Sequence, residues 1–310
     1  MNYKDIEIVT LDSSNIKDAY SLHTEVFPQT ISYQQFGKKY STNYSGFSNI
    51  SQIAYYKNIP IAFNGFLPAL IYHQEGKIRA AQSCDSITLE KYRRHGIWSQ
   101  VILKSYEKIK ENNCDFVIGF FTEISRKAFL KLNWKISKNR VFYFNIQVQP
   151  IPGWKIFTRF YPGNEILWLK NKLSNYFEIS ESIENILNDE NACSYIYNPE
   201  YINYKISLTS FIIKVDELKF WVKPKSYFEI GAVEYKDKSS LRKGIEKLKN
   251  ILKKFFFQEI LIYAPLNSKL YADLEEMYKP FPGWEIGFFD FSDNFSGENI
   301  MCNSADIDTY

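Results

Sequence analysis

The feature that most constrains the fold is a strand, a glycine-containing turn and a helix in immediate succession. The strand is expected over residues 79–89 and an amphipathic helix over residues 99–110. The turn between them contains Arg93, Arg94 and Gly96. A helix N-terminus presents unpaired backbone N–H groups and a partial positive charge, and both favour a phosphate anion. The succession therefore predicts a phosphate-binding turn.

A second strand and a second helix follow this turn. Residues 115–121 form a continuous apolar run, which is typical of a strand buried on both faces. Residues 122–132 predict a helix, with Thr122 as its N-cap and Asn133 as a left-handed residue just after its end. Alternating strands and helices of this kind predict an α/β fold with a mixed sheet.

At these residues the chain resembles the GCN5-related N-acetyltransferase (GNAT) superfamily. The phosphate loop of that superfamily reads Gln/Arg-x-x-Gly-x-Gly/Ala, and residues 93–98 match its first four positions. Trp98 departs from the pattern, because a small residue is usual there. The second superfamily pattern, Asn-x-x-Ala-x-x-x-Tyr-x-x-x-Gly-Phe, is echoed by Thr122, Ser125, Phe129, Asn133 and Trp134. The resemblance covers residues 1–145.

The resemblance implies that acyl-coenzyme A is the co-substrate and that no metal is needed. Backbone groups of the first strand are expected to pair with the pantetheine arm, and N–H groups of the loop to hold the pyrophosphate. The residues expected to bind the coenzyme are Ile87, Thr88, Leu89, Arg93, Arg94, His95, Gly96, Ile97, Trp98 and Thr122. The alternative is that the two arginines form a solvated surface pair beside an ordinary turn glycine.

The groups that transfer protons are harder to assign. Phe129 replaces the tyrosine that acts as the acid in many GNAT enzymes, so another group donates a proton or the thiolate leaves unaided. Asp85 is the candidate general base, because an ammonium must lose a proton before it attacks a thioester. The alternative for Asp85 is a structural polar residue. Ser125 is a candidate donor to the departing sulfur, or simply a first-turn helix residue. His23 and His73 show no spacing that suggests catalysis.

At 310 residues the chain is about twice as long as one GNAT unit, so a second core is expected. We predict a GNAT domain over residues 1–148, closed by a strand over residues 141–148, and a connecting region over residues 149–208. Residues 209–310 repeat the order of strands and helices without an Arg-x-x-Gly loop. They predict a degenerate GNAT-like unit that shapes the acceptor site or forms an interface, such as that of a homodimer.

The remaining elements of the first domain are expected in the order strand, helix, polar segment and hairpin. The polar segment covers residues 33–40 and is expected to be mobile and to face the substrate. In the connecting region, residues 194–204 are expected to be irregular. In the first domain the other predictions are a strand over residues 6–10, a helix over 13–27 and a hairpin over 53–72. In the second unit they are strands over residues 211–215, 219–222, 228–235, 259–264 and 284–291, a helix over 239–255 and a helix opened by Asn267 and Ser268.

The charge of the chain is balanced, with 38 basic and 35 acidic residues and a formal net charge of +3. This balance argues against nucleic acid or an anionic membrane as a partner. No apolar run approaches the roughly 20 residues that span a bilayer, and the N-terminus lacks an apolar signal core, so a cytoplasmic location is expected. The cysteines show no metal-ligand or paired spacing and are expected to be reduced: Cys84, Cys114, Cys193 and Cys302.

In length and in its degenerate second half, the chain resembles GNAT-type acyltransferases of bacterial surface-polysaccharide (O-antigen) pathways. The resemblance implies transfer of an acetyl or 3-hydroxybutyryl group to the amine of a nucleotide-linked amino sugar, for example a dTDP-linked amino-dideoxyhexose. A tRNA-dependent aminoacyltransferase is an alternative, although no basic stripe is evident. Acetylation of a protein or polyamine fits the first domain equally well. A non-catalytic coenzyme-binding module is a further alternative, because Phe129 lacks an acidic proton.

Overall fold

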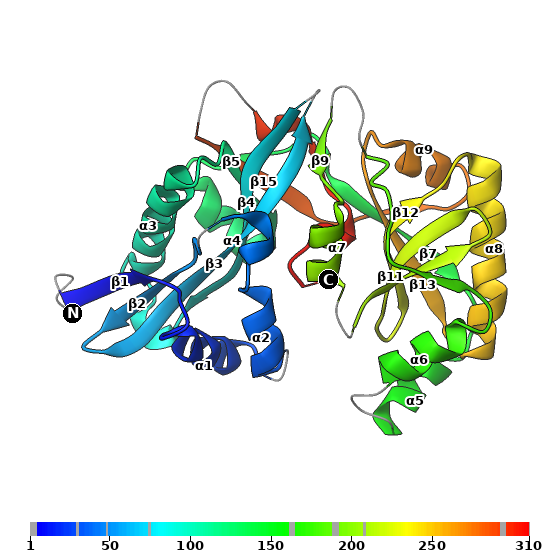
Figure 1. The fold of residues 1–310 in the computed structure, drawn as a ribbon, viewed down its shortest axis with the longest axis horizontal. Helices are drawn as coiled ribbons and strands as arrows, with labels where there is room; N and C mark the ends of the chain where they lie inside the picture. The colour runs from blue at the N-terminus through cyan, green and yellow to red at the C-terminus, as the bar shows by residue number, and fades with distance from the viewer. Residues whose placement is uncertain are drawn as a thin grey trace. The chain divides into compact units, whose positions relative to one another are not determined.

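The computed structural model describes residues 5–28, 31–47, 49–73, 76–160, 165–187, 192–206, 209–291 and 296–309. The chain forms two compact units, each built around its own mixed sheet (Figure 1). The first unit comprises Met1–Ile71, Lys77–Ile136 and Gly287–Gly297, and the second comprises Tyr72–Gly76, Ser137–Ile286 and Glu298–Tyr310.

The first unit begins with a strand, two helices and a hairpin, which confirms the predicted strand, first helix and hairpin. Lys57 and Asn58 form the two-residue hairpin turn with φ angles of 51° and 61°, and such left-handed turns match the twist of the flanking strands. The bounds are β1 (Ile6–Thr10), α1 (Ile16–Val26), α2 (Tyr33–Lys39), β2 (Gln52–Tyr56) and β3 (Ile59–His73).

Helix α2 corrects the expectation of a polar segment over residues 33–40. Ser32 caps this helix by accepting a hydrogen bond from the Gln35 amide, and the Gln35 side chain in turn accepts from the Ser32 amide. Phe36 is fully buried on its inner face. The capping box and the buried Phe36 side chain therefore explain why this mostly polar segment forms a short helix.

The rest of the first unit is the predicted strand, turn, helix, strand and helix. Its elements are β4 (Gly76–Thr88), a 3-10 helix (Glu90–Tyr92), α3 (Ile97–Glu111), β5 (Phe116–Phe121), α4 (Glu123–Leu130) and β6 (Lys135–Ile136). Thr122 caps α4 and Asn133 has a φ of 61°, as predicted. The sheet runs in the order β1-β2-β3-β4-β5-β15-β6, where β15 (Glu285–Asp290) comes from the far end of the chain.

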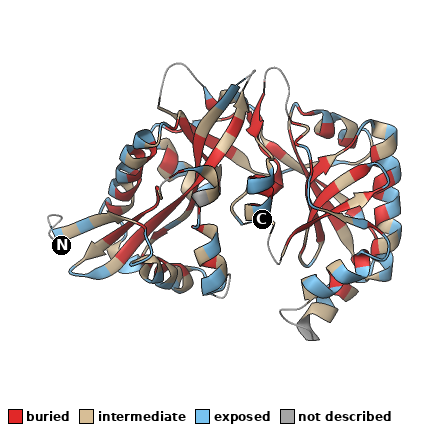
Figure 2. Cartoon of the chain, in the orientation of Figure 1, coloured by how far each residue is buried: buried red, intermediate tan, exposed pale blue. Residues whose placement is uncertain are grey.

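The second unit has a sheet in the order β14-β7-β13-β12-β11-β10-β8. Figure 2 shows buried residues concentrated along its strands and along one side of the long helix α8. Its elements are β7 (Val141–Gln147), α5 (Gly153–Phe160), α6 (Glu165–Leu173), β8 (Glu178–Ser180), β9 (Cys193–Tyr195), α7 (Pro199–Lys205), β10 (Phe211–Val215), β11 (Leu218–Pro224), β12 (Phe228–Glu234), α8 (Lys238–Lys254), β13 (Glu259–Pro265), α9 (Lys269–Glu275), β14 (Pro280–Pro282) and β16 (Ile300–Met301).

The second unit repeats the architecture of the first. Strands β12 and β13 are parallel with α8 between them in sequence, as β4 and β5 are parallel with α3 between them. Helix α9 then follows β13 as α4 follows β5, and Ser268 caps it as expected. The residues predicted as irregular contain β9 and α7, because Asn198 caps α7 and Pro199 occupies its first turn.

Each sheet contains a strand from the other half of the sequence. Strand β7 was expected to close the first domain but pairs with β13 and β14 in the second sheet. Strand β15 was expected to end the second unit, yet Gly287–Asp290 lies in the first, where β15 pairs with β6. Apolar patterning predicts that a segment is a strand, but it does not indicate which sheet will accept that strand. None of the described helices is both long and apolar enough to cross a membrane.

Candidate functional site

The parallel strands β4 and β5 separate at the centre of the first sheet. Their pairing runs from Ala80 opposite Phe116 to Ser83 opposite Gly119. Strand β4 continues for residues 84–88 beyond this pairing, and β5 continues for residues 120–121. Backbone groups on the facing sides of the separated ends are open to a ligand, because a strand edge carries a row of donors and acceptors. The separation begins next to Asp85.

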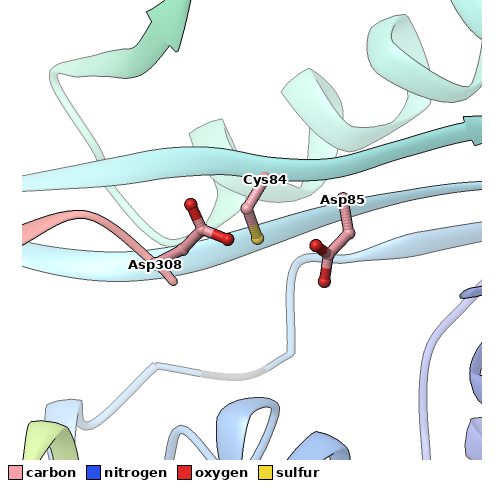
Figure 3. A group of neighbouring side chains, drawn as sticks. All are labelled: Cys84, Asp85 and Asp308. Carbon is pink, nitrogen blue, oxygen red and sulfur yellow. The ribbon is translucent and has the colours of Figure 1, made fainter. Parts of the chain in front are cut away.

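A β-bulge lies where the strands separate. Asp85 has a left-handed φ of 42°, and the side chains of Cys84 and Asp85 leave β4 on the same side (Figure 3). The Tyr40 hydroxyl contacts both of them, lying 3.5 Å from Cys84 Sγ and 2.6 Å from Asp85 Oδ2. Consecutive side chains of a regular strand point to opposite faces, so the bulge turns the carboxylate to the face that α2 covers.

Asp85 is held by three side chains, which come from α1, from α2 and from the C-cap residue of α2. Lys39 Nζ lies 2.8 Å from Oδ2, Tyr40 donates to the same oxygen, and His23 Nε2 lies 3.8 Å from Oδ1. Burial alone raises the pKa of the Asp85 carboxyl, but the charge and hydrogen bond of Lys39, the Tyr40 hydrogen bond and the His23 charge together hold it below its usual value. Burial and the neighbouring carboxylate raise the pKa of Tyr40 well above normal. Asp85 is therefore ionised and Tyr40 neutral.

Three of these site residues were not predicted. Lys39 and Tyr40 come from the segment expected to be polar, mobile and facing the substrate, and His23 was expected to have no catalytic spacing. The spacing that matters is spatial: α1 and α2 pack together and bring all three side chains to the bulge. Aromatic side chains at regular positions of these helices, such as Tyr20 and Phe36 with ring centroids 5.6 Å apart, were the available signal for that packing.

The predicted turn between β4 and α3 is present, and its binding of phosphate stays a prediction. Gly96 is the N-cap of α3 with a left-handed φ of 72°, and it provides no side chain to cap the first-turn amides. A Cβ atom at this position would meet no protein atom within 4 Å. The first turn of α3 is thus open in front of its amides. Arg93, Arg94 and His95 are exposed beside it, and Arg94 is also left-handed, with a φ of 65°.

The end of β4 shows which backbone groups face the separation. The Leu89 amide donates to Ile61 O in β3, so it is already occupied. Backbone groups alternate in direction along a strand, so those of Ile87 face β3 as well, while those of Ser86 and Thr88 face the separation. The Thr88 hydroxyl oxygen is buried and has no hydrogen-bond partner among the described residues. Of the three predicted strand residues, Thr88 alone has backbone groups on the side of the separation, and its carbonyl oxygen there already accepts a hydrogen bond from Arg93 Nε at 3.0 Å.

The sequence matches no protein-family model and no curated protein, but its structure is similar to solved ones. A GCN5-related N-acetyltransferase from Kribbella flavida is 7% identical with a TM-score of 0.62, over 93% of this chain and 72% of the other. A putative acetyltransferase from Pyrococcus horikoshii is 12% identical with a TM-score of 0.55, over 98% and 95%. Saccharomyces cerevisiae N-myristoyltransferase with bound myristoyl-CoA is 10% identical with a TM-score of 0.55, over 98% and 84%.

The fold is that of the GCN5-related N-acetyltransferases. Because each match extends over more than nine-tenths of this chain, it includes both units. The predicted fold class, a GNAT fold followed by a degenerate GNAT-like unit, is confirmed.

In this GNAT fold, the residues that depart from the superfamily patterns pack together. Trp98 stands edge-on against Phe129, with ring centroids 5.0 Å apart and an interplanar angle of 84°. Phe129 is stacked on Phe121 and lies 4.5 Å from the Trp134 ring. Only 5% of Phe129 is exposed. The large side chain at the small-residue position and the missing tyrosine are thus two parts of one aromatic cluster.

Ser125 takes part in the cap of α4. Its hydroxyl accepts from the Thr122 amide at 2.9 Å, and the Ser125 amide donates to the Thr122 hydroxyl at 3.2 Å. This reciprocal pair satisfies two amides of the helix N-terminus. The capping geometry accounts for both residues, and a role for either of them toward the coenzyme stays a prediction.

In the second GNAT-like unit, α8 corresponds to α3, but its N-terminus is capped by a side chain. Asp237 is the N-cap of α8, and its carboxylate accepts from the Ser240 amide at 2.8 Å. The Ser240 hydroxyl accepts in turn from the Asp237 amide. A fixed negative charge on the first turn repels a phosphate, whereas Gly96 leaves the first turn of α3 open. Of the two corresponding helix ends, that of α3 has no side-chain cap and that of α8 has one.

Proposed function

We propose that this protein is an N-acyltransferase that moves an acyl group from acyl-coenzyme A to the primary amine of a nucleotide-linked amino sugar. The observation that carries the proposal is the combination, in one unit, of an uncapped helix end at Gly96 and a buried carboxylate at the strand separation. The helix end at Gly96 would hold the pyrophosphate. The Asp85 carboxylate lies beside the separated strands, where the acceptor amine would meet the thioester. Neither feature is required for stability, since a capped helix and a regular strand are both more favourable.

In the proposed complex, amides at the start of α3 and the side chains of Arg93 and Arg94 hold the phosphates. Backbone groups of Ser86, the Thr88 amide and the unpartnered Thr88 hydroxyl bond the amides of the pantetheine arm, while the Thr88 carbonyl oxygen stays with Arg93 Nε. Backbone N–H groups at the separation stabilise the oxyanion. These residues fit the chemistry of acyl-coenzyme A, which alternates anionic, amide and apolar parts.

Asp85 receives the amine proton in the proposed reaction. The amine attacks the thioester carbon, a C–N bond forms, the C–S bond breaks, and the coenzyme leaves as a thiolate. A carboxyl with a lowered pKa is a weak base for a free ammonium. It becomes effective once the nitrogen has bonded to the carbonyl carbon, because that nitrogen is then far more acidic. Phe129 has no acidic proton, so the thiolate leaves without an acid at that position, as the ordinary pKa of a thiol allows.

Two observations bear on the acceptor. In the described part of the second unit, α8 begins with a capped N-terminus instead of an open turn, and we propose that this unit recognises the larger part of the acceptor, such as a nucleotide. Lys39 neutralises Asp85, and this disfavours a polyamine, whose several positive charges need an excess of acidic groups. These observations support an acceptor with one reactive amine attached to an anionic carrier.

Thermal unfolding in the presence of candidate ligands tests the proposal, because a ligand that binds only the native state raises its stability by mass action. The coenzyme series is acetyl-, 3-hydroxybutyryl- and myristoyl-coenzyme A, with desulfo-coenzyme A as a matched control for the phosphates. The acceptor series is nucleotide-linked amino sugars, with the same nucleotides carrying neutral sugars as controls. We expect stabilisation by one acyl-coenzyme A and by one amino sugar, and release of free thiol only when both are present.

Other outcomes assign other functions. Stabilisation by a coenzyme, together with thiol release in the presence of peptide amines, would identify a protein acetyltransferase. Stabilisation by a coenzyme without thiol release from any amine would identify a binding module. No response to any coenzyme would contradict the proposal as a whole.

A further inference from the structure

The second unit has a cluster of exposed apolar side chains around α5, α6 and the end of α8. Large apolar side chains exposed singly are ordinary, but a contiguous exposed group marks a surface that binds a protein or a membrane. We call this group the apolar patch, and its members with their exposed fractions are Ile151 (60%), Ile156 (51%), Leu167 (52%), Trp168 (39%), Tyr176 (43%) and Phe256 (57%).

Contacts between rings join the parts of the apolar patch. Trp168 packs against Phe157 of α5 and against Phe255, with ring centroids 4.9 Å and 6.0 Å apart. The Tyr176 ring lies 6.1 Å from the same Phe255 ring. Phe256 is held next to α5, since the Trp154 amide donates to its carbonyl oxygen at 2.9 Å. Figure 1 shows α5 and α6 at the end of α8 that leads to these residues. These contacts join α5, α6 and the end of α8, the elements that carry the apolar patch.

Phe256 occupies a backbone position that disfavours it. It follows the last turn of α8 with a left-handed φ of 59°, where glycine or asparagine is normally found. Its side chain is more than half exposed, so core packing does not compensate for the strained backbone. A strained residue whose side chain points into solvent indicates that the side chain serves a function other than folding.

Lysines surround the apolar patch. Lys172 Nζ lies 6.0 Å from the centroid of the Trp168 ring, and Lys254 Nζ lies 4.7 Å from that of Tyr176. Lys155 and Lys253 are also exposed on the same elements. Residues 151–176 contain four basic residues against one acidic residue. The balanced charge of the whole chain, which argued against an anionic membrane, thus hides a local excess of positive charge.

We propose that the apolar patch binds the surface of a membrane that contains anionic lipids. Helices with tryptophan, phenylalanine and leucine on one side and lysines around them lie in the headgroup region, where the rings enter the acyl boundary and the lysines face phosphates. A second copy of the chain is a poorer occupant. A two-fold symmetric contact would bring two lysine-rich surfaces together, and like charges oppose association.

Sedimentation of the full chain with lipid vesicles tests this inference without reference to the acyl transfer. We expect the protein to sediment with phosphatidylcholine vesicles containing about one-third phosphatidylglycerol, at least about tenfold more than with pure phosphatidylcholine, and binding should weaken as salt rises. The variant Ile156→Ser/Leu167→Ser/Phe256→Asn should lose at least about tenfold in vesicle affinity. Its melting temperature should be kept, because asparagine tolerates the left-handed backbone at position 256.

Two controls match these changes. Ile59→Ser/Leu103→Ser/Ile124→Ser removes three apolar side chains of comparable or greater exposure from the first unit and should sediment like the unmodified protein. Lys172→Glu/Lys254→Glu should weaken binding to anionic vesicles, whereas Lys236→Glu/Lys243→Glu makes the same change in net charge outside the apolar patch and should not.

Three results would overturn the inference. The first is no sedimentation of the unmodified protein with anionic vesicles, and the second is equal sedimentation of the patch variant. The third is a dimer in analytical ultracentrifugation that the patch variant converts to a monomer while vesicles bind neither, which would assign the surface to a second copy of the chain.

Discussion

Lys39 Nζ and Asp85 Oδ2 lie 2.8 Å apart, and the two side chains are only 10% and 9% exposed. Removing two charges from water is costly, and a buried pair of this kind seldom adds net stability. Its effect here is to fix the carboxylate at the bulge of β4 against helix α2. A carboxylate held ionised in this way meets the requirement of the proposed acyl transfer, in which a negative group must face the reacting amine.

Replacing Asp85 by asparagine should lower turnover by about 10²–10⁴-fold, since it removes the proton acceptor while keeping the shape of the side chain. The KM for acyl-coenzyme A should change little, because in the proposed complex the phosphates are held at the start of α3, away from Asp85. Steady-state kinetics with a saturating acceptor measures both. Asp18→Asn is the matched control: its carboxylate also accepts from a tyrosine, Tyr55, at 2.7 Å, but outside the site. Turnover of Asp85→Asn at the level of this control would remove Asp85 from the mechanism.

Replacing Lys39 by methionine should destabilise the protein by about 3–5 kcal/mol, because it leaves a buried carboxylate without its partner. Burial would then dominate and raise the pKa of Asp85. The Asp85 carboxylate would then be protonated at a higher pH than in the unmodified protein. The acid limb of the pH–rate profile should therefore shift to higher pH. Denaturant unfolding and pH–rate curves measure the two effects.

The double variant Lys39→Met/Asp85→Asn separates ion pairing from packing. If the two residues interact as an ion pair, removing both charges should restore much of the stability that Lys39→Met loses. A double variant whose loss equals the sum of the two single losses would show that the pair contributes no coupling.

Much of the first unit could be predicted because its signals are local. Consecutive residues form β4, the glycine turn and α3, so their succession can be recognised from the sequence. Gly96 adopts a left-handed conformation, which glycine tolerates. The site could not be predicted in full, because the residues that contact one another there are far apart in the sequence. Lys39 is 46 residues from Asp85 in sequence. The bulge was hidden as well, since an aspartate occupies its left-handed position and gives no sign of it.

The exchange of strands between the two sheets has a similar cause. The apolar residues of β7 and β15 indicate strands, but the preference for one sheet depends on side chains far away in the sequence. A Cβ atom on Gly287 would lie 1.9 Å from the Phe121 ring, so only glycine in β15 leaves room for that ring of β5. Such complementarity between residues 121 and 287 becomes visible only when both strands are placed.

Replacing Gly96 by alanine should weaken acyl-coenzyme A binding at least about tenfold. A Cβ atom would disfavour the left-handed turn that opens the first-turn amides, and an altered turn no longer directs them at the phosphates. Isothermal titration with acetyl-coenzyme A measures the affinity. Gly46→Ala is the matched control, because Gly46 has a φ of 67° and equally open space around a Cβ. Equal affinities of the two variants would show that the turn does not hold the coenzyme.

Restoring the superfamily tyrosine through Phe129→Tyr should not raise turnover. Phe129 is 5% exposed within the cluster of Trp98, Phe121 and Trp134, so an added hydroxyl would be buried among rings. An unsatisfied buried hydroxyl should cost about 1–3 kcal/mol of stability. Steady-state kinetics and thermal unfolding report the two effects. A rise in turnover would show instead that position 129 reaches the departing sulfur and that an acid there limits the rate.

Asp306 should make the stability of the second unit depend on pH. Its carboxyl is fully buried; the Asn303 amide donates to Oδ2 at 2.7 Å, and the Tyr201 hydroxyl lies 3.4 Å from Oδ1. Burial raises the pKa of Asp306 to about 7, because these hydrogen bonds, that of Tyr197 and the charge of Lys205 offset only part of the desolvation.

The unfolded chain ionises near the ordinary value of 3.8, while the folded chain keeps its proton until about pH 7. Between these values the folded state binds more protons, so its stability falls as pH rises and levels off above about 7. The free energy of unfolding should fall by up to roughly 4 kcal/mol, since each unit of pKa shift corresponds to about 1.36 kcal/mol. Asp306→Asn should flatten the pH dependence of denaturant unfolding, whereas Asp216→Asn, at an exposed ion pair with Lys247, should keep the slope. An unchanged slope in Asp306→Asn would show that Asp306 is already ionised in the fold, with Lys205 as its counter-charge.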